Sequence, residues 1–296
     1  MKILIAYDGS MHANVAIDDL QWAGLPQDAK ARVVSVVEWP LHAPRSWGMV
    51  NTDFPHEWTF RVAAAERSAQ AACDRIQKLF PQWDLQLETP TGSPAQMILE
   101  RAAEWPADLI VVGTHGRSRL ARVVLGSVSM KLVKEASCSV RVARARNHDG
   151  PLRLLIGDDG SSEADGAVDE VCRRSWPAGA EARILGVHEI LVTTNAERMA
   201  ISGRFYDQIN EDEHFRLKHV GTRAAERLHN AGLLVSPVVI EGDPKEALVQ
   251  EARTWNADTI FIGARGLGRI ERLLLGSVSS ATVGHAPCTV EVVRTH

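Results

Sequence analysis

The chain repeats itself at a spacing of about 150 residues, and this repeat constrains the fold more than any other feature. Ala107–Gly113 reads ADLIVVG, and Ala257–Gly263 reads ADTIFIG 150 positions later. The tetrapeptide Gly-Ser-Val-Ser at Gly126–Ser129 returns at the same spacing at Gly276–Ser279. Solenoid and propeller repeats have periods of roughly 20–50 residues. The longer period therefore indicates a duplicated whole domain.

The start of the repeat also defines the boundary between the two copies. Asp-Gly-Ser at Asp8 returns at Asp159, a spacing of 151, so the second copy is one residue shorter than the first between this turn and the later motifs. A short polar stretch over 146–151 ends in turn residues, as linkers between domains do. We therefore expect two domains, 1–148 and 149–296.

Within each half, short aliphatic runs alternate with segments of helical periodicity. The predicted strands are 2–7, 31–38, 84–89, 108–112 and 139–143, then 152–157, 181–188, 233–240, 258–262 and 289–293. The predicted helices are 11–24, 57–80, 93–104 and one beginning at Gly126, then 162–175, 208–231, 243–255 and one beginning at Gly276. Such alternation is typical of a parallel sheet with right-handed crossovers. The sequence predicts an α/β fold: two tandem open five-stranded parallel sheets with helices on both faces.

Composition excludes several classes of protein. The chain of 296 residues is 45% hydrophobic and 24% charged, with a formal net charge of −4. It lacks the basic patch of a nucleic-acid binder and the run of about 18 apolar residues of a membrane span. Met1–Tyr7 turns polar at Asp8, too early for a signal peptide. The four cysteines (73, 138, 172 and 288) are too scattered for a disulfide framework. We expect a cytoplasmic protein with neither nucleic-acid nor membrane partners.

A glycine-bearing loop follows the fourth strand of each half. In the first half Gly113 and Gly116 are followed, after nine residues, by Gly126 and Ser127. The second half repeats this spacing at Gly263, Gly266, Gly276 and Ser277. Glycines let backbone N–H groups converge on an anion, and the helix that follows offers its N-terminus to phosphate. Six arginines of these loops would add positive charge: Arg117, Arg119, Arg122, Arg265, Arg269 and Arg272.

An aspartate ends the first strand of each half, at Asp8 and Asp159. In an open parallel sheet, ligands bind at the carboxyl ends of the strands, where the strand order reverses. A carboxylate does not favour a triphosphate, so we expect it to bond the base or ribose end. A phosphate loop at one end and an acid at the other indicate a nucleotide.

Simpler interpretations stand beside this one. The glycines suit tight turns needed for close packing, and each aspartate suits a turn residue that bonds its own backbone. We expect His115 to be exposed, because its counterpart is Arg265 and no acid–base role is shared. The histidines show no metal-ligand spacing, so no metal site is predicted. Trp105 and Trp255 are interpreted as core packing, and the unmatched tryptophans at 39, 47 and 58 as a packing, ligand or partner surface.

The motif Gly-x2-Gly-x9-Gly-Ser, with an aspartate ending the first strand, resembles the ATP-binding branch of the universal stress protein family. The resemblance implies a Rossmann-like, adenine nucleotide alpha hydrolase-like fold in each half. It implies that ATP or another adenine nucleotide, with Mg²⁺ as a possible companion, contacts Asp8, Gly113, Gly116, Gly126 and Ser127 and their counterparts Asp159, Gly263, Gly266, Gly276 and Ser277. Backbone contacts to adenine would come from Val37 and Val187.

The resemblance also implies that the last strands pair, giving an internal pseudo-dimer and the option of a homodimer. The family often has Cys-Pro-Val there, whereas this chain has Ser139 and Thr289 at the proline position. The second half also differs in having Asp158 beside Asp159, where the first half has Tyr7 beside Asp8. A second carboxylate would repel phosphates or hold a cation, so the two sites need not be equivalent.

Three functions remain open. The first is a stress-response regulator that holds ATP with little or no turnover. The second is a slow ATPase or nucleotidyl transferase, although the sequence has no Gly-x4-Gly-Lys-Ser/Thr loop. The third is an interaction module that binds no nucleotide and acts through a dimer surface. We expect the first, because both loop motifs are intact and no catalytic apparatus accompanies them.

Overall fold

The chain divides into two compact units, Met1–Ala145 and Arg146–His296. The computed structural model describes residues 1–38, 54–116, 125–189, 203–267 and 275–295. The elements of the first unit are β1 Lys2–Ala6, α1 Met11–Asp19, η1 Leu20–Trp22, β2 Lys30–Val34, α2 Phe54–Leu79, β3 Asp84–Glu88, α3 Pro94–Glu104, β4 Leu109–Gly113, α4 Ser127–Glu135 and β5 Ser139–Ala143.

The second unit repeats this order of elements. They are β6 Arg153–Gly157, α5 Ser162–Arg173, β7 Glu181–His188, α7 Gly203–Asn230, β8 Leu234–Glu241, α8 Pro244–Thr254, β9 Thr259–Gly263, α9 Ser277–His285 and β10 Thr289–Val293.

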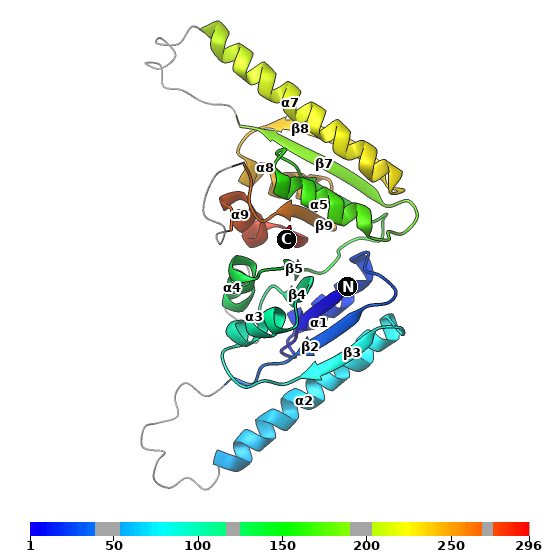
Figure 1. Cartoon of the computed structure of the whole chain (residues 1–296), viewed down its shortest axis with the longest axis vertical. Coiled ribbons are helices and arrows are strands. Elements are labelled where there is room, and N and C mark those ends of the chain that lie inside the picture. Colours follow the sequence, from blue (N-terminus) through cyan, green and yellow to red (C-terminus); the bar gives the residue numbers. More distant parts are fainter. Residues whose placement is uncertain (39–53, 117–124, 190–202, 268–274, 296) are drawn as a thin grey trace. The chain divides into compact units, whose positions relative to one another are not determined.

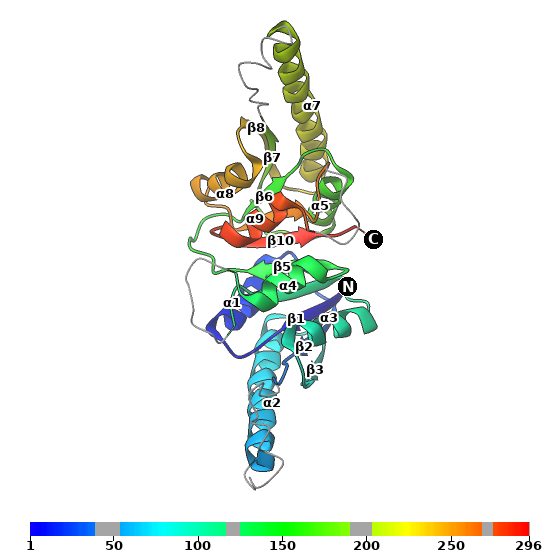
Figure 2. The same ribbon diagram turned by 90° about the vertical axis from the view of Figure 1, so that its left-hand side faces the viewer.

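Each unit contains five parallel strands with helices on both faces, which confirms the predicted fold class. The strand order in the first unit is β3-β2-β1-β4-β5, and in the second it is β8-β7-β6-β9-β10. In the first unit α1 packs with α2 on one face, and α3 packs with α4 on the other (Figures 1 and 2). In the second unit the corresponding pairs are α5 with α7 and α8 with α9.

The central strands are apolar because helices cover both of their faces. Every residue of β4 and every residue of β9 is buried. Cys138 and Cys288, each just before the last strand of its unit, are buried, as expected of small apolar groups. The strand order reverses between β1 and β4, so the carboxyl ends of β1, β2 and β4 meet beside this point.

The expectation that Trp105 and Trp255 pack in the core is wrong. Both rings are only half-buried at the ends of α3 and α8. The guanidinium of Arg32 lies 4.4 Å from the ring centroid of Trp105, and that of Arg183 lies 4.4 Å from the ring centroid of Trp255. A half-exposed ring covered by a guanidinium gains cation–π attraction while the charge keeps contact with water. The repeated tryptophans therefore mark a repeated surface contact.

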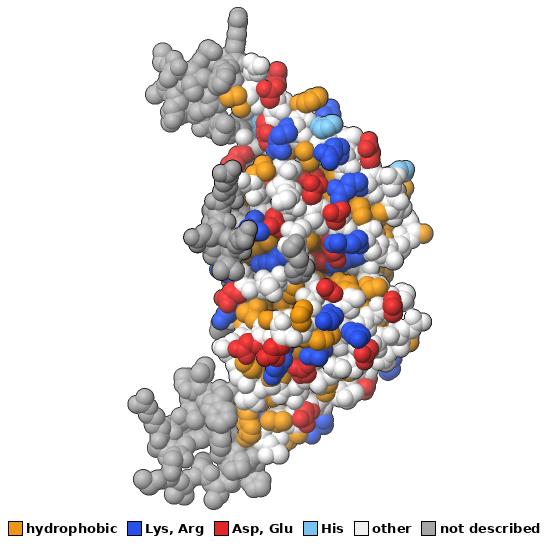
Figure 3. Space-filling view, viewed as in Figure 1, with side chains coloured by type: hydrophobic (Ala, Val, Ile, Leu, Met, Phe, Trp, Pro, Cys, Tyr) orange, Lys and Arg blue, Asp and Glu red, His pale blue; other side chains and the backbone are white. Residues whose placement is uncertain are grey.

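The described surface carries charges of both signs. Basic and acidic side chains alternate over the exposed faces of α5 and α7 (Figure 3), where Arg227 pairs with Asp165 and Asp169. Among the helices that the structure describes, none combines the length and the apolar character needed to cross a bilayer.

Candidate functional site

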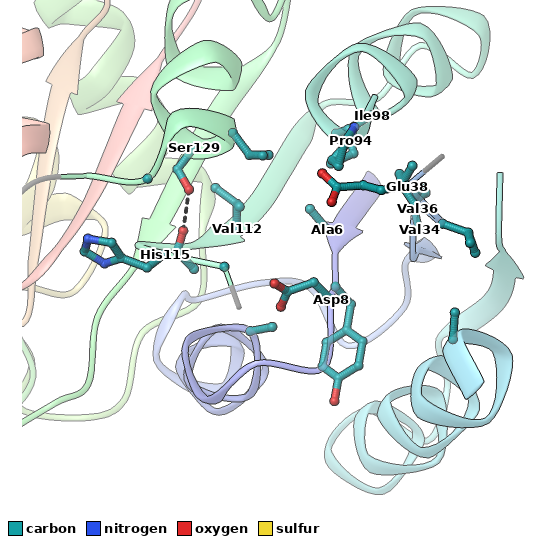
Figure 4. A pocket seen from close by; sticks show the side chains of 18 of the residues that line it. Ala6, Asp8, Val34, Val36, Glu38, Pro94, Ile98, Val112, His115 and Ser129 are labelled. Carbon is teal, nitrogen blue, oxygen red and sulfur yellow. Dashed lines mark hydrogen bonds between the residues drawn. The ribbon is translucent and has the colours of Figure 1, made fainter. Parts of the chain in front are cut away.

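A cavity of about 510 Å³ opens at the carboxyl edge of the sheet in the first unit (Figure 4). Its walls come from the ends of β1, β2 and β4, from α2, and from the first turns of α3 and α4. The six residues predicted in the first half all line it: Asp8, Val37, Gly113, Gly116, Gly126 and Ser127. Cavities of 300–1,000 Å³ are typical of small-molecule sites.

Two of the three glycines are required by packing. A Cβ on Gly113 would stand 2.5 Å from the carbonyl oxygen of His12, and one on Gly126 would stand 3.0 Å from that of Thr114. A Cβ on Gly116 would instead stand 2.9 Å from Oδ2 of Asp8. Gly113 and Gly126 thus allow backbone to approach backbone, while Gly116 leaves room beside a carboxylate in the cavity.

The first turn of α4 borders the cavity. Gly126 is its N-cap residue and provides no side-chain cap. Ser127, Val128 and Ser129 line the cavity, and the hydroxyl of Ser129 donates 2.7 Å to the carbonyl of Gly113 (Figure 4). The first N–H groups of a helix lack partners within it and carry the positive end of its dipole. This end of the cavity suits an anion.

Asp8 lies beside the glycine loop. Its Oδ1 accepts a bond of 2.9 Å from the N–H of Ser10, so Asp8 is a turn residue as well as a lining residue. Ser10 in turn caps α1 through the N–H of Ala13. Because Oδ2 of Asp8 faces the position of Gly116, the expectation that this acid stands at the end opposite the loop is wrong. Strand β1 is central, so its carboxyl end lies between the two ends of the cavity.

The carboxylate at the far end is that of Glu38, which sequence reasoning missed. In Figure 4 Glu38 lies with Val34 and Val36 near Pro94 and Ile98, on the side of Asp8 away from His115. It follows Val37 directly in the chain, and its position at the end of the predicted strand 31–38 was the available signal. An apolar wall with one carboxylate can hold a flat ring and accept hydrogen bonds from its amino or hydroxyl groups.

The backbone of Val37 is already engaged. Its N–H donates 2.9 Å to the carbonyl of Pro90, and its carbonyl accepts 3.1 Å from the N–H of Gly92. The backbone contact to adenine that was expected from Val37 therefore cannot use its N–H group. Only the second lone pair of its carbonyl oxygen is left for such a contact.

His115 is half-buried and lines the cavity, so the expectation that it is simply exposed is wrong. Its ring centroid lies 5.1 Å from that of His12, and Nδ1 of His12 lies 3.1 Å from Oγ1 of Thr114. Burial and the neighbouring His115 lower the pKa of His12, and Asp8 opposes this shift. His12 was missed by sequence reasoning because only the fold brings the first turn of α1 against β4.

In the second unit the motif glycines hold similar positions. Gly263 approaches Glu163 of α5, with a would-be Cβ 2.7 Å from that of Glu163, and Gly266 approaches Oδ2 of Asp159. Gly276 is the N-cap residue of α9 and provides no side-chain cap, and Ser277 is the first residue of that helix. The carboxylate of Asp159 is engaged on both oxygens, by the N–H groups of Ser161 at 3.0 Å and Leu267 at 3.1 Å.

Val187, the expected counterpart of Val37, is displaced by one residue. Ala6 pairs with Val34, and Gly157 pairs with Leu185, so this part of the two copies is related by 151 positions. The true counterpart of Val37 is His188, whose carbonyl accepts 3.1 Å from the N–H of Gly242, as that of Val37 does from Gly92. Successive side chains of a strand point to opposite faces, so Val187 faces away from the position that Val37 occupies.

Some predicted residues fall outside the described part of the chain: Arg117, Arg119, Arg122, Arg269, Arg272, Trp39 and Trp47. Within the described residues, no three His, Cys, Asp or Glu side chains are grouped so as to hold a metal ion.

The sequence model of the universal stress protein family matches residues 1–144 and again residues 152–294. The chain belongs to the universal stress protein family. A universal stress protein of Mycobacterium tuberculosis is 30% identical over 306 aligned positions, covering 99% of this chain and 96% of that protein. The two family domains in tandem therefore extend over the full length of a relative.

Solved universal stress proteins share the fold. One from Archaeoglobus fulgidus superposes with a TM-score of 0.64 at 20% identity, covering 99% of this chain and 96% of that one. A universal stress protein family member from Arabidopsis thaliana, solved with AMP bound, covers 49% of this chain and 93% of that one at 18% identity and a TM-score of 0.34. The AMP belongs to that protein.

Proposed function

We propose that this universal stress protein binds an adenine nucleotide, ATP first among them, in the cavity of its first unit. The observation that carries the proposal is the convergence of all six predicted residues of the first half on one cavity, with an uncapped helix N-terminus at one end and an apolar wall at the other. A nucleotide has the same division into an anionic and a flat, largely apolar end.

The lining residues suggest how each part of the ligand is held. The phosphates would lie at Gly116 and the first turn of α4, where N–H groups and the hydroxyl of Ser127 are near. The base would lie between the valines of β2 and Ile98, with Glu38 as an acceptor for its amino group. Asp8, between these ends, would bond ribose or a phosphate-bound Mg²⁺, which proteins usually hold through one or two carboxylates and the phosphates themselves.

We infer a regulatory role with little or no turnover. Phosphoryl transfer needs charge on the transferred phosphate to be neutralised by a positioned lysine, arginine or metal, and needs a group that orients the nucleophile. The sequence has no P-loop lysine, and no second acid recurs in both halves to orient a nucleophile. Bound nucleotide would instead shift the conformation or the partner affinity of the protein. Pairing through β5 and β10 and homodimer formation stay predictions of the family resemblance, and a cytoplasmic location stays a prediction from the composition.

Isothermal titration of the full chain with ATP and Mg²⁺ tests the proposal. We expect binding that is lost in Gly116→Leu, because any side chain there meets Asp8. Gly150→Leu is the matched control, since this glycine lies near His148 in the second unit, away from the motif. Absence of heat with the wild-type chain would refute nucleotide binding and favour the interaction module. Multiple turnover abolished by Asp8→Ala would favour the ATPase.

A further inference from the structure

The long helices α2 and α7 are related by 152 positions, which a comparison of the two units reveals. Arg75 of α2 pairs with Asp18 of α1, and Arg227 of α7 pairs with Asp169 of α5. The buried residues of the two helices follow the same spacing: Ala65, Ala72 and Ile76 in α2, and Leu217, Ala224 and Leu228 in α7. The residue that corresponds to Ala64, a lining residue of the first cavity, is therefore Arg216.

Arg216 reaches from α7 to the turn that follows β6. Its Nη2 donates 3.0 Å to the carbonyl of Asp159. A Cβ on Gly160 would stand 2.5 Å from Nη1 of Arg216, so the guanidinium lies on the Asp159–Gly160 turn. Glu213 holds it there through two bonds of 2.7 Å, to Nε and Nη2. The guanidinium of Arg216 is thus held by Glu213 of its own helix and by the turn after β6, whereas its counterpart Ala64 lines the open cavity of the first unit.

Other residues that differ between the two copies of the site also favour a closed site in the second unit. His12 and His115 correspond to Glu163 and Arg265, which form an ion pair beside Gly263. Ala6 corresponds to Gly157, and Leu248 and Ile262 close over it, each 3.1 Å from the place of a Cβ.

The acid content of the second copy is higher as well. Tyr7 corresponds to Asp158, which is buried and lies next to Asp159 in the chain. Oδ2 of Asp158 has no hydrogen-bond partner among the described residues. A second carboxylate at this place disfavours a phosphate by like-charge repulsion. Both steric and electrostatic features of the second unit thus differ from those of the first.

We infer that Arg216 closes the second copy of the site to nucleotides, so that each chain binds one nucleotide, in its first unit. The inference rests on the proposed function and goes beyond it, because it assigns the occupied unit and the residue that excludes the ligand from the other.

The first test is the stoichiometry of ATP·Mg²⁺ binding to the full chain by calorimetry. We expect one site per chain, lost in Gly116→Leu and kept in Gly266→Leu. Two sites in the wild-type chain, or one site lost only in Gly266→Leu, would overturn the inference while leaving nucleotide binding intact. Absence of any binding would instead overturn the proposed function, and the inference with it.

The second test exchanges the residues at the two corresponding positions, Ala64 and Arg216. Ala64→Arg should weaken ATP binding at least about tenfold by filling the first cavity, whereas Gln70→Arg, which adds the same charge on an exposed face of α2, should leave it unchanged. Arg216→Ala should reveal a second, weaker binding event. A single site in Arg216→Ala together with full binding in Ala64→Arg would show that Arg216 does not decide the difference. Thermal melts of each variant establish that it is folded.

Discussion

The ring centroids of His12 and His115 lie 5.1 Å apart in the first unit. Their counterparts in the second unit, Glu163 and Arg265, form an ion pair. The same two places in the fold therefore hold a titratable pair in the first unit and a charge-neutral pair in the second. Histidine is the side chain whose charge changes near neutral pH. The two copies must respond differently to pH at this point.

Nucleotide affinity of the first unit should rise as the pH falls from about 7.5 to about 5.5. Burial and His115 hold the pKa of His12 below its ordinary value, so in the absence of ligand it stays neutral further into the acid range. A phosphate in the cavity favours the protonated form, so binding takes up protons and strengthens as protons become available. Calorimetry in buffers of different ionisation enthalpy measures this uptake.

The nucleotide also titrates in this range, so the control is the double variant His12→Asn, His115→Asn. It reports the pH dependence of the ligand alone, and we expect a flatter profile than that of the wild-type chain. If nucleotide affinity depended on pH identically in the two proteins, the histidine pair would have no part in binding.

Gly113→Ala should destabilise the first unit by about 2 kcal/mol, because overpacking against rigid neighbours costs about 1–3 kcal/mol. The added Cβ would stand 2.5 Å from a backbone oxygen of α1, which a side-chain rotation cannot relieve. Gly284→Ala is the contrasting change, since an added Cβ there meets nothing within 4 Å. In helix α9 it should stabilise by about 0.5–1 kcal/mol. Urea unfolding of both variants measures the difference, and equal effects would refute the packing role of Gly113.

Asp19→Ala should cost the first unit about 3–5 kcal/mol, the range for removing one partner of a buried ion pair. Nε of Arg141 donates 2.5 Å and Nη2 donates 3.2 Å to the carboxylate of Asp19, and both side chains are buried. Asp19→Ala combined with Arg141→Met should recover most of the loss, because the charge is removed with its partner. Hydrogen exchange followed by mass spectrometry reads the first unit by itself. A loss below about 1 kcal/mol in the single variant would contradict the prediction.

Asp158→Asn should stabilise the second unit at neutral pH. Burial raises the pKa of Asp158 above its ordinary value of 3.8, despite a bond from the N–H of Gly160. The folded state therefore binds this proton more tightly than the unfolded state, and stability is lost as the pH rises through the raised pKa. Asparagine removes this titration, so its advantage over the wild-type chain should shrink as the pH falls toward about 4. Thermal melts at several pH values, with hydrogen exchange to assign the unit, measure this. An advantage that is constant with pH would contradict it.

The order of elements and the motif glycines were predictable because they are local properties of the chain. Short aliphatic runs such as Ile3–Ala6, which is buried throughout, alternate with segments of helical period such as α3. The six first-half residues came together as expected, since the carboxyl ends of adjacent parallel strands must meet at one edge. Trp105 was misplaced because a repeated aromatic residue signals a repeated contact without saying whether that contact is in the core or at the surface.

The differences between the two sites could not be predicted, because the spacing that relates corresponding residues of the two copies changes from one element to the next. His188 replaces Val37 and Arg216 replaces Ala64, at spacings of 151 and 152, whereas the glycine motif repeats at 150. A shift of one residue in a strand reverses the face of every side chain, and a shift of two in a helix turns a residue by about 200°. Local sequence cannot set these shifts, because they are absorbed in the connections between elements.

The sequence by itself determined that this protein is two copies of one parallel α/β domain, each with an intact glycine motif and an aspartate after its first strand. Repeats, periodicity and motif spacing all lie along the chain and need no partner elsewhere in the fold. Only the tertiary structure decided which side chains reach the cavity, bringing His12 of α1 to His115 and Arg216 of α7 to Asp159. Those contacts join residues 57 or more positions apart, and packing alone selects them.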